Sequence, residues 1–144
     1  MDLAWKQVQL TALLQALKNG QDRLALLVER AKERPPLAPE LRIDGNLLPG
    51  CLAKLWLTTK FQDGKCFFDC DSDSLVVKAV AGLLCDLYSG QTPAEIVAHD
   101  PGFLTPLGIT QHMTPNRRNA LSRVWERIRG FAEVQGASPP PTAS

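Results

Sequence analysis

Four cysteines, at positions 51, 66, 70 and 85, are the residues of this sequence best suited to chemistry. Cys51 stands apart because it follows Pro49-Gly50 directly and precedes a strand-like run. Turn residues usually present a side chain at the surface, whereas cysteine is usually a core residue. A thiol at a turn can approach another protein's active site, which a thiol within a strand cannot. For Cys51 the position therefore suggests a chemical role as an alternative to a packing role.

The other three cysteines fit a packing role. Cys66 and Cys70 lie four residues apart in an alternating segment, so they share one face with Phe68. That pattern predicts two small core residues, and the alternative is that one of them pairs with Cys51 under oxidation. Cys85 falls off the apolar stripe of its predicted helix. No CxxC pair and no Cys/His cluster has zinc spacing, so we predict no metal site.

Composition narrows the class of protein. The 144 residues are 44% hydrophobic and 22% charged, with a net charge of +1, which fits one globular domain and gives no electrostatic reason to expect nucleic acid. No apolar run approaches the roughly 20 residues of a membrane-spanning helix, and the first ten residues do not resemble a secretory signal. We therefore expect a cytoplasmic protein, without membrane contact, whose thiols are reduced.

The start of the last predicted helix carries an electrostatic oddity. If Thr114 caps that helix, Arg117 and Arg118 lie in its first turn, where each cation opposes the helix dipole at a cost of roughly 0.3–1 kcal/mol. Both side chains could simply be solvated. The alternative is a functional electropositive spot, which would stabilise a sulfur anion or hold an acidic group of a partner.

The elements that must position these residues follow from periodicity. Apolar residues recur at helical spacing in residues 10–17, 24–31, 76–87 and 121–132, and the first two stretches, separated by Asn19-Gly20, predict a helical hairpin. Residues 53–61 and 65–70 alternate around Asp63-Gly64, which predicts a β-hairpin, with a possible short strand at 46–48. Trp56 falls on the polar face, which indicates a covering helix or a contact surface.

These elements predict an α+β fold. We expect a small antiparallel sheet of about three strands flanked by helices, with an N-terminal helical hairpin and a long C-terminal helix. One domain should span residues 1–135. Residues 136–144 are rich in proline, serine and alanine, and we predict a disordered tail there.

Four sequence blocks, in order, carry a family resemblance: "PPLAPELR", "GCLAKLWL", "DSDSLVVKAVAGLL" and "YSGQTPAEIVAHDPGFLTPLGITQHMTPNRRNAL". Together they resemble the SufE-type sulfur acceptors over about residues 20 to 132. The resemblance implies an α+β fold with a small curved antiparallel sheet. It differs from the usual pattern at Ala79, where glycine is common after the lysine, and at Cys70, where glycine or alanine is usual.

The resemblance also implies a function. Members of this family bind a pyridoxal-phosphate cysteine desulfurase (SufS-like), stimulate it, accept its persulfide sulfur onto their own cysteine and pass it to an iron–sulfur scaffold. By position the acceptor is Cys51. The resemblance places support of the sulfur site or partner binding on Asp71, Asp73, Lys78, His112 and Arg117. It implies no cofactor of the chain's own, because pyridoxal phosphate belongs to the desulfurase, and a monomer or weak homodimer.

Two other functions remain open at this point. One is a cysteine-dependent hydrolase, in which His112 would have to lie within hydrogen-bond reach of the Cys51 sulfur. The other is a structural adaptor in which all four thiols are inert. For a sulfur acceptor we expect a mobile turn, with Cys51 pointing inward at rest and swinging out on docking.

Overall fold

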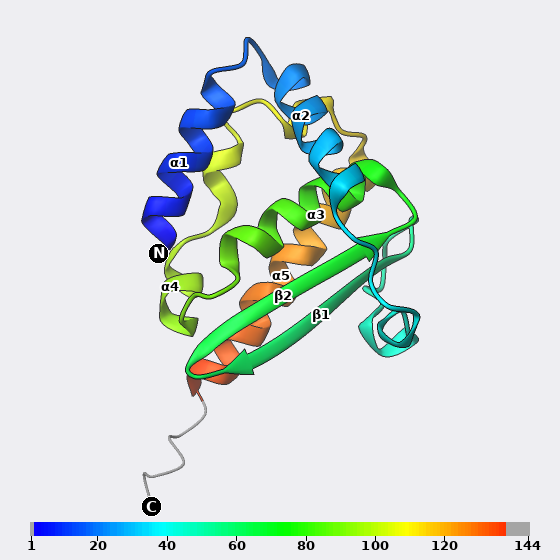
Figure 1. The fold of residues 1–144 in the computed structure, drawn as a ribbon, viewed down its shortest axis with the longest axis vertical. Coiled ribbons are helices and arrows are strands. Elements are labelled where there is room, and N and C mark those ends of the chain that lie inside the picture. Colours follow the sequence, from blue (N-terminus) through cyan, green and yellow to red (C-terminus); the bar gives the residue numbers. More distant parts are fainter. Residues whose placement is uncertain (1, 138–144) are drawn as a thin grey trace, which may run out of the picture.

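The computed structural model describes residues 2–137, and Figure 1 shows an α+β fold, which confirms the predicted class. The α-helices are α1 (Leu3–Gln15), α2 (Gly20–Glu33), α3 (Leu75–Tyr88), α4 (Pro93–Ala98) and α5 (Pro115–Ala137). The strands are β1 (Leu55–Gln62) and β2 (Lys65–Ser72). Short 3-10 helices connect them: η1 (Pro39–Leu41), η2 (Asp44–Asn46), η3 (Pro101–Leu104) and η4 (Thr110–His112). The first two residues of the predicted tail lie in α5, and residues 138–144 lie outside the described residues.

The sheet is a single hairpin. Its register runs from Leu55 opposite Ser72 to Gln62 opposite Lys65. The turn is Asp63-Gly64, with φ of 54° and 78°, and two successive left-handed residues match the twist of a two-residue hairpin. The predicted β-hairpin is therefore confirmed.

The expected number of strands was wrong, because the described residues form a two-stranded sheet instead of about three strands. The candidate strand at 46–48 is reduced to one bridge between Leu47 and Trp56, with the Leu48 N–H donating to the Leu55 carbonyl at 2.8 Å. Asp44–Asn46 is already a 3-10 helix, and Pro49 has no N–H to extend a ladder. The segment thus touches the sheet once and turns away.

Helices cover one face of the hairpin and the loop that contains η1 and η2 covers part of the other. Figure 1 shows α3 and α5 running beside the hairpin. Phe68 of β2 meets Phe131 of α5 edge-on, with ring centroids 5.8 Å apart. On the opposite face Trp56 is almost fully buried, and the Arg42 guanidinium lies 4.4 Å from its ring centroid. The unusual Trp56 is thus covered by a loop instead of a helix.

Candidate functional site

Cys51 lies in a loop of residues 47–54, which we call the Cys51 loop, between η2 and β1. Gly50 has a φ of +80°, a conformation that favours glycine, and it turns the chain immediately before the thiol. Cys51 itself is half-buried, whereas the next side chain, Leu52, is 82% exposed. The loop therefore places a sheltered sulfur next to an exposed apolar side chain.

The N-terminal half of the loop rests on α5. The Asn119 side-chain amide donates to the Gly50 carbonyl at 3.1 Å. The Arg123 guanidinium, one helical turn further along, lies so close to Gly50 that an added Cβ would come within 3.3–3.5 Å of three of its atoms. Glycine at position 50 thus permits the left-handed turn, and a larger residue there would also press on the Arg123 side chain.

The C-terminal half of the loop is fixed by the end of β2. The Asp73 carboxylate accepts a hydrogen bond from the Lys54 N–H at 3.0 Å, and the Asp73 N–H donates to the Lys54 carbonyl at 3.2 Å. The Ser72 hydroxyl donates to the same carbonyl at 2.7 Å. Among the described residues, the backbone groups of 51–53 have no hydrogen-bond partner. Asp73 therefore anchors the loop, while its centre is held only by packing.

Asp71 and Lys78 form an ion pair that contacts residues 34–42, the segment that precedes the Cys51 loop. Asp71 is buried, and its carboxylate accepts from the Leu37 N–H at 3.1 Å and lies 3.4 Å from the Lys78 ammonium. Lys78 also donates to the Arg34 carbonyl at 3.0 Å, and Arg42 approaches Asp71 to 3.8 Å. These contacts join β2, α3 and the chain after α2. The pair therefore holds the segment that precedes the Cys51 loop, and it does not contact the sulfur.

Two hollows of about 280 Å³ each flank the Cys51 loop. The first, which we call the Arg117 hollow, lies between Leu52-Ala53, the start of α3 and the first turns of α5. The second, the Phe131 hollow, lies between Leu48-Pro49 and the middle of α5, with Arg123 on its wall. A partner that approaches Cys51 would meet these two depressions on either side of the thiol.

The predicted cap of α5 is confirmed, because the Thr114 hydroxyl accepts from the Arg117 N–H at 3.3 Å. Arg118, the second cation of that turn, donates to the Met113 carbonyl at 2.8 Å and to the Thr110 carbonyl at 3.4 Å. These bonds offset the unfavourable dipole term for Arg118. Arg117 is exposed and lines the Arg117 hollow, at the rim of the Cys51 loop.

The cation that acts on Cys51 is Arg123, which sequence reasoning missed. Burial raises the pKa of the Cys51 thiol above its ordinary value, and the charge of Arg123 acts in the opposite direction. Neither Arg117 nor His112 is among the described groups that shift this pKa. The available sequence signal was the row Asn119, Arg123 and Arg127, spaced four residues apart on α5 and off its apolar stripe.

His112 lies in η4 and is exposed. Within residues 2–137 no hydrogen bond joins its side chain to Cys51. The structure therefore does not assemble the thiol–imidazole pair that a cysteine hydrolase would need.

Cys66 and Cys70 lie in the core, as predicted, and Cys85 is buried with them. Cys66, Cys70 and Cys85 are each 0% exposed, and all four cysteines of the chain are free. A hydrogen bond with Cys70, together with burial, raises the pKa of Cys85 well above its ordinary value. Burial raises the pKa of Cys66 to about 11. Because the thiolate is the nucleophile, the raised pKa values disfavour reaction at Cys66 and Cys85, and Cys70 is enclosed by the core.

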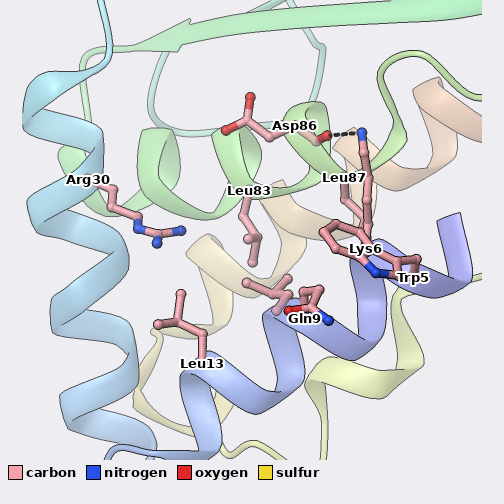
Figure 2. A pocket seen from close by; sticks show the side chains of 9 residues that line it. Trp5, Lys6, Gln9, Leu13, Arg30, Leu83, Asp86 and Leu87 are labelled. Atoms are coloured by element: carbon pink, nitrogen blue, oxygen red, sulfur yellow. Dashed lines mark hydrogen bonds between the residues drawn. The ribbon is translucent and has the colours of Figure 1, made fainter. Parts of the chain in front are cut away.

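A third hollow, of about 260 Å³, lies between α1, α2 and α3 (Figure 2). The Lys6 ammonium crosses one end of it and donates to the Asp86 carbonyl at 3.0 Å and the Ser89 carbonyl at 2.9 Å. Trp5 on its rim is 47% exposed. No cysteine lines this hollow, so it is separate from the Cys51 site.

In residues 2–137, no group of three or more histidine, cysteine, aspartate or glutamate side chains could hold a metal ion. None of the helices in this part of the chain is both long and apolar enough to cross a bilayer.

Comparison with known proteins agrees with this architecture. A solution structure of a hypothetical protein from Thermus thermophilus superposes with a TM-score of 0.74 over 92% of this chain and 97% of that one, at 24% identity, which establishes the shared fold. An uncharacterized SufE-like protein of Synechocystis sp. is 31% identical over 77% of this chain and 70% of its own length. An uncharacterized SufE-like protein of Rhizobium etli is 30% identical over 85% of this chain and 86% of its own. The SufE family pattern, described as an Fe–S metabolism associated domain, matches residues 8–132, so the chain belongs to the SufE family.

Proposed function

We propose that this protein takes sulfur from the persulfide of a cysteine desulfurase onto Cys51 and passes it on for iron–sulfur cluster assembly. The observation that carries the proposal is the contrast in exposure, because Cys51 is half-buried in a turn while the other three cysteines are fully buried. Membership of a family associated with Fe–S metabolism supports the same chemistry.

The reaction is a thiol exchange. The Cys51 thiolate attacks the outer sulfur of the donor persulfide, a new S–S bond forms on Cys51, and the donor S–S bond breaks. The donor cysteine leaves as a thiolate and takes up a proton. No net oxidation occurs, because the outer sulfur moves between two equivalent thiols. The exchange as written requires from this protein an accessible, ionisable thiol.

The loop supports such a transfer because it is fixed at its ends and loose in its centre. Asn119 and Asp73 hold the flanking residues Gly50 and Lys54, whereas residues 51–53 depend on packing. We infer that Cys51 rests against the protein and swings outward when the partner docks, with Leu52 entering an apolar surface of the desulfurase. Shielding at rest would protect a persulfide from water and oxidants.

The test is to mix the protein with a pyridoxal-phosphate cysteine desulfurase and L-cysteine, and to measure intact mass and alanine release. The proposal predicts a gain of about 32 Da per sulfur atom carried and faster alanine release than with the desulfurase alone. A chain whose mass and whose effect on the desulfurase both remain unchanged, with a SufE-family acceptor as positive control, would contradict it.

A further inference from the structure

The Arg123 guanidinium lies against Gly50, whose φ of +80° favours glycine. Its guanidinium atoms Nη2, Nε and Cζ would lie 3.3, 3.4 and 3.5 Å from a Cβ at position 50. The guanidinium therefore lies on the side of Gly50 where another residue would carry its Cβ. Asn119, one turn earlier on α5, holds the carbonyl of the same residue at 3.1 Å. Together they form a seat for the residue that precedes the thiol.

We propose that Arg123 is a positioning residue for Cys51, which holds the turn through Gly50 and supplies the positive charge beside the sulfur that accepts and then carries the transferred atom. This inference rests on the proposed function, and it names a residue outside the family blocks that suggested that function. Arg123 belongs to α5, so its role depends on how this helix packs against the loop.

The chemistry explains why a cation is needed there. Transfer requires the thiolate, but burial of Cys51 favours the neutral thiol, and the charge of Arg123 opposes that effect. After transfer, the terminal sulfur lies about 2 Å beyond the original one, across the new S–S bond, and carries the negative charge. A guanidinium has several donors in one plane and remains charged, so it suits both anions.

Arg123 has the freedom to follow the loop. Its side chain is 45% exposed, and its pairing with Glu126 is long, at 3.6 Å. The charged residues that surround the loop are Lys54 and Asp73 at its C-terminal end, and Arg117, Arg123, Glu126 and Arg127 on α5. Among these described groups, Arg123 is the one whose charge acts on Cys51.

The experiment compares the pH dependence of Cys51 alkylation by iodoacetamide in the wild type and in Arg123→Gln, Arg123→Lys and Arg129→Gln. Peptide mass spectrometry reports Cys51 separately from the core thiols. Arg129→Gln is the matched control, because it removes the same charge from an exposed α5 arginine that pairs with Glu133 at 2.7 Å. Thermal melting of each variant checks that the fold is intact.

In Arg123→Gln we expect iodoacetamide to alkylate Cys51 about two- to five-fold more slowly at pH 7, and the pH profile to move to higher pH. The reason is that a smaller fraction of the thiol is ionised at a given pH when the positive charge is absent. Arg123→Lys should recover at least half of that loss, and Arg129→Gln should match the wild type. The proposal is overturned if Arg123→Gln alkylates like the wild type, if Arg129→Gln is equally slow, or if Arg123→Lys recovers nothing.

The alkylation readout involves no desulfurase, so it is independent of the proposed function. If the wild type takes up no sulfur from any desulfurase, the proposed function fails, while the alkylation profiles still decide whether Arg123 controls the reactivity of Cys51. If the wild type does take up sulfur, Arg123→Gln should do so more slowly by a similar factor. Uptake at the wild-type rate in that variant would contradict the inference.

Discussion

The Cys51 loop and the sulfur-rich core contain the same side chain in opposite settings. Cys66, Cys70 and Cys85 are 0% exposed, burial raises the pKa of Cys66, and a hydrogen bond with Cys70 together with burial raises the pKa of Cys85. Cys51 is half-buried and follows a glycine turn, and the Arg123 guanidinium lies against that glycine. From this difference we infer that backbone position and exposure, and not residue type, decide which thiol is available for chemistry.

The largest expected effect comes from removing one thiol from each region in turn. Cys51→Ser should abolish sulfur uptake and change the free energy of unfolding by no more than about 0.5 kcal/mol, because the side chain is only half-buried in a turn. Cys66→Ala should retain uptake and lose about 1 kcal/mol of stability. Intact mass and urea unfolding measure the two effects. Uptake that survives in Cys51→Ser would show that a core thiol is reactive.

The support beneath the loop offers the next largest effect. Asp71→Ala removes a buried carboxylate that accepts from Leu37 and pairs with Lys78; it leaves the Leu37 N–H without its acceptor and the Lys78 ammonium with the Arg34 carbonyl but no carboxylate. We expect a loss of about 3 kcal/mol in urea unfolding. Asp86→Ala, which removes an exposed partner of Arg34, is the control and should cost no more than about 1 kcal/mol. Equal losses in the two variants would mean that the buried contacts of Asp71 contribute nothing special.

The core thiols also predict a pH effect with a definite sign. Burial raises the pKa of Cys66 from 9.0 to about 11, so the folded protein keeps this proton when the unfolded chain has lost it. The resulting stabilisation is fully present below pH 9 and is lost as pH rises through 11. Urea unfolding between pH 9 and 11 should therefore show a falling stability, with a shallower fall in Cys66→Ala. An equal slope in the variant would contradict the burial argument.

The smallest expected effect concerns Arg117. This exposed cation opposes the dipole of α5, so Arg117→Ala should leave thermal stability unchanged or raise it by a few tenths of a kcal/mol. If Arg117 grips an acidic group of the desulfurase, the variant should bind it a few-fold more weakly, and added salt should weaken the wild type in the same way. Since Arg123 is the cation that acts on Cys51, the alkylation profile should not move. Lower stability with normal sulfur uptake would make Arg117 an ordinary structural residue.

Local signals predicted much of this fold because local chemistry decides those features. Asp63-Gly64 forms the predicted hairpin turn, and Thr114 forms the predicted cap of α5. The prediction of a third strand was wrong. The pattern of residues 46–48 does not show that η2 ends at Asn46 and that Pro49 lacks an N–H, which together leave a single bridge to the sheet. Cys85, which lay off its helical stripe, is buried against Cys70 by tertiary packing.

The site was only partly predictable for the same reason. Cys51 could be chosen because the Pro-Gly turn before it is a local feature of the sequence. The contact between Gly50 and Arg123 joins residues 73 positions apart, and no periodicity in either segment indicates it. Sequence therefore identified the thiol and one cation near its loop, Arg117. The second cation, Arg123, which lies against Gly50, became visible only through the packing of α5 against the loop.

The most direct test of the account is to locate the transferred sulfur. After incubation with a desulfurase and L-cysteine, persulfides would be trapped by alkylation, and the peptides that contain Cys51, Cys66, Cys70 and Cys85 would be compared by mass spectrometry. The account predicts a gain of about 32 Da on the Cys51 peptide and none on the other three thiols. Sulfur on a core cysteine while Cys51 remains unmodified would contradict it.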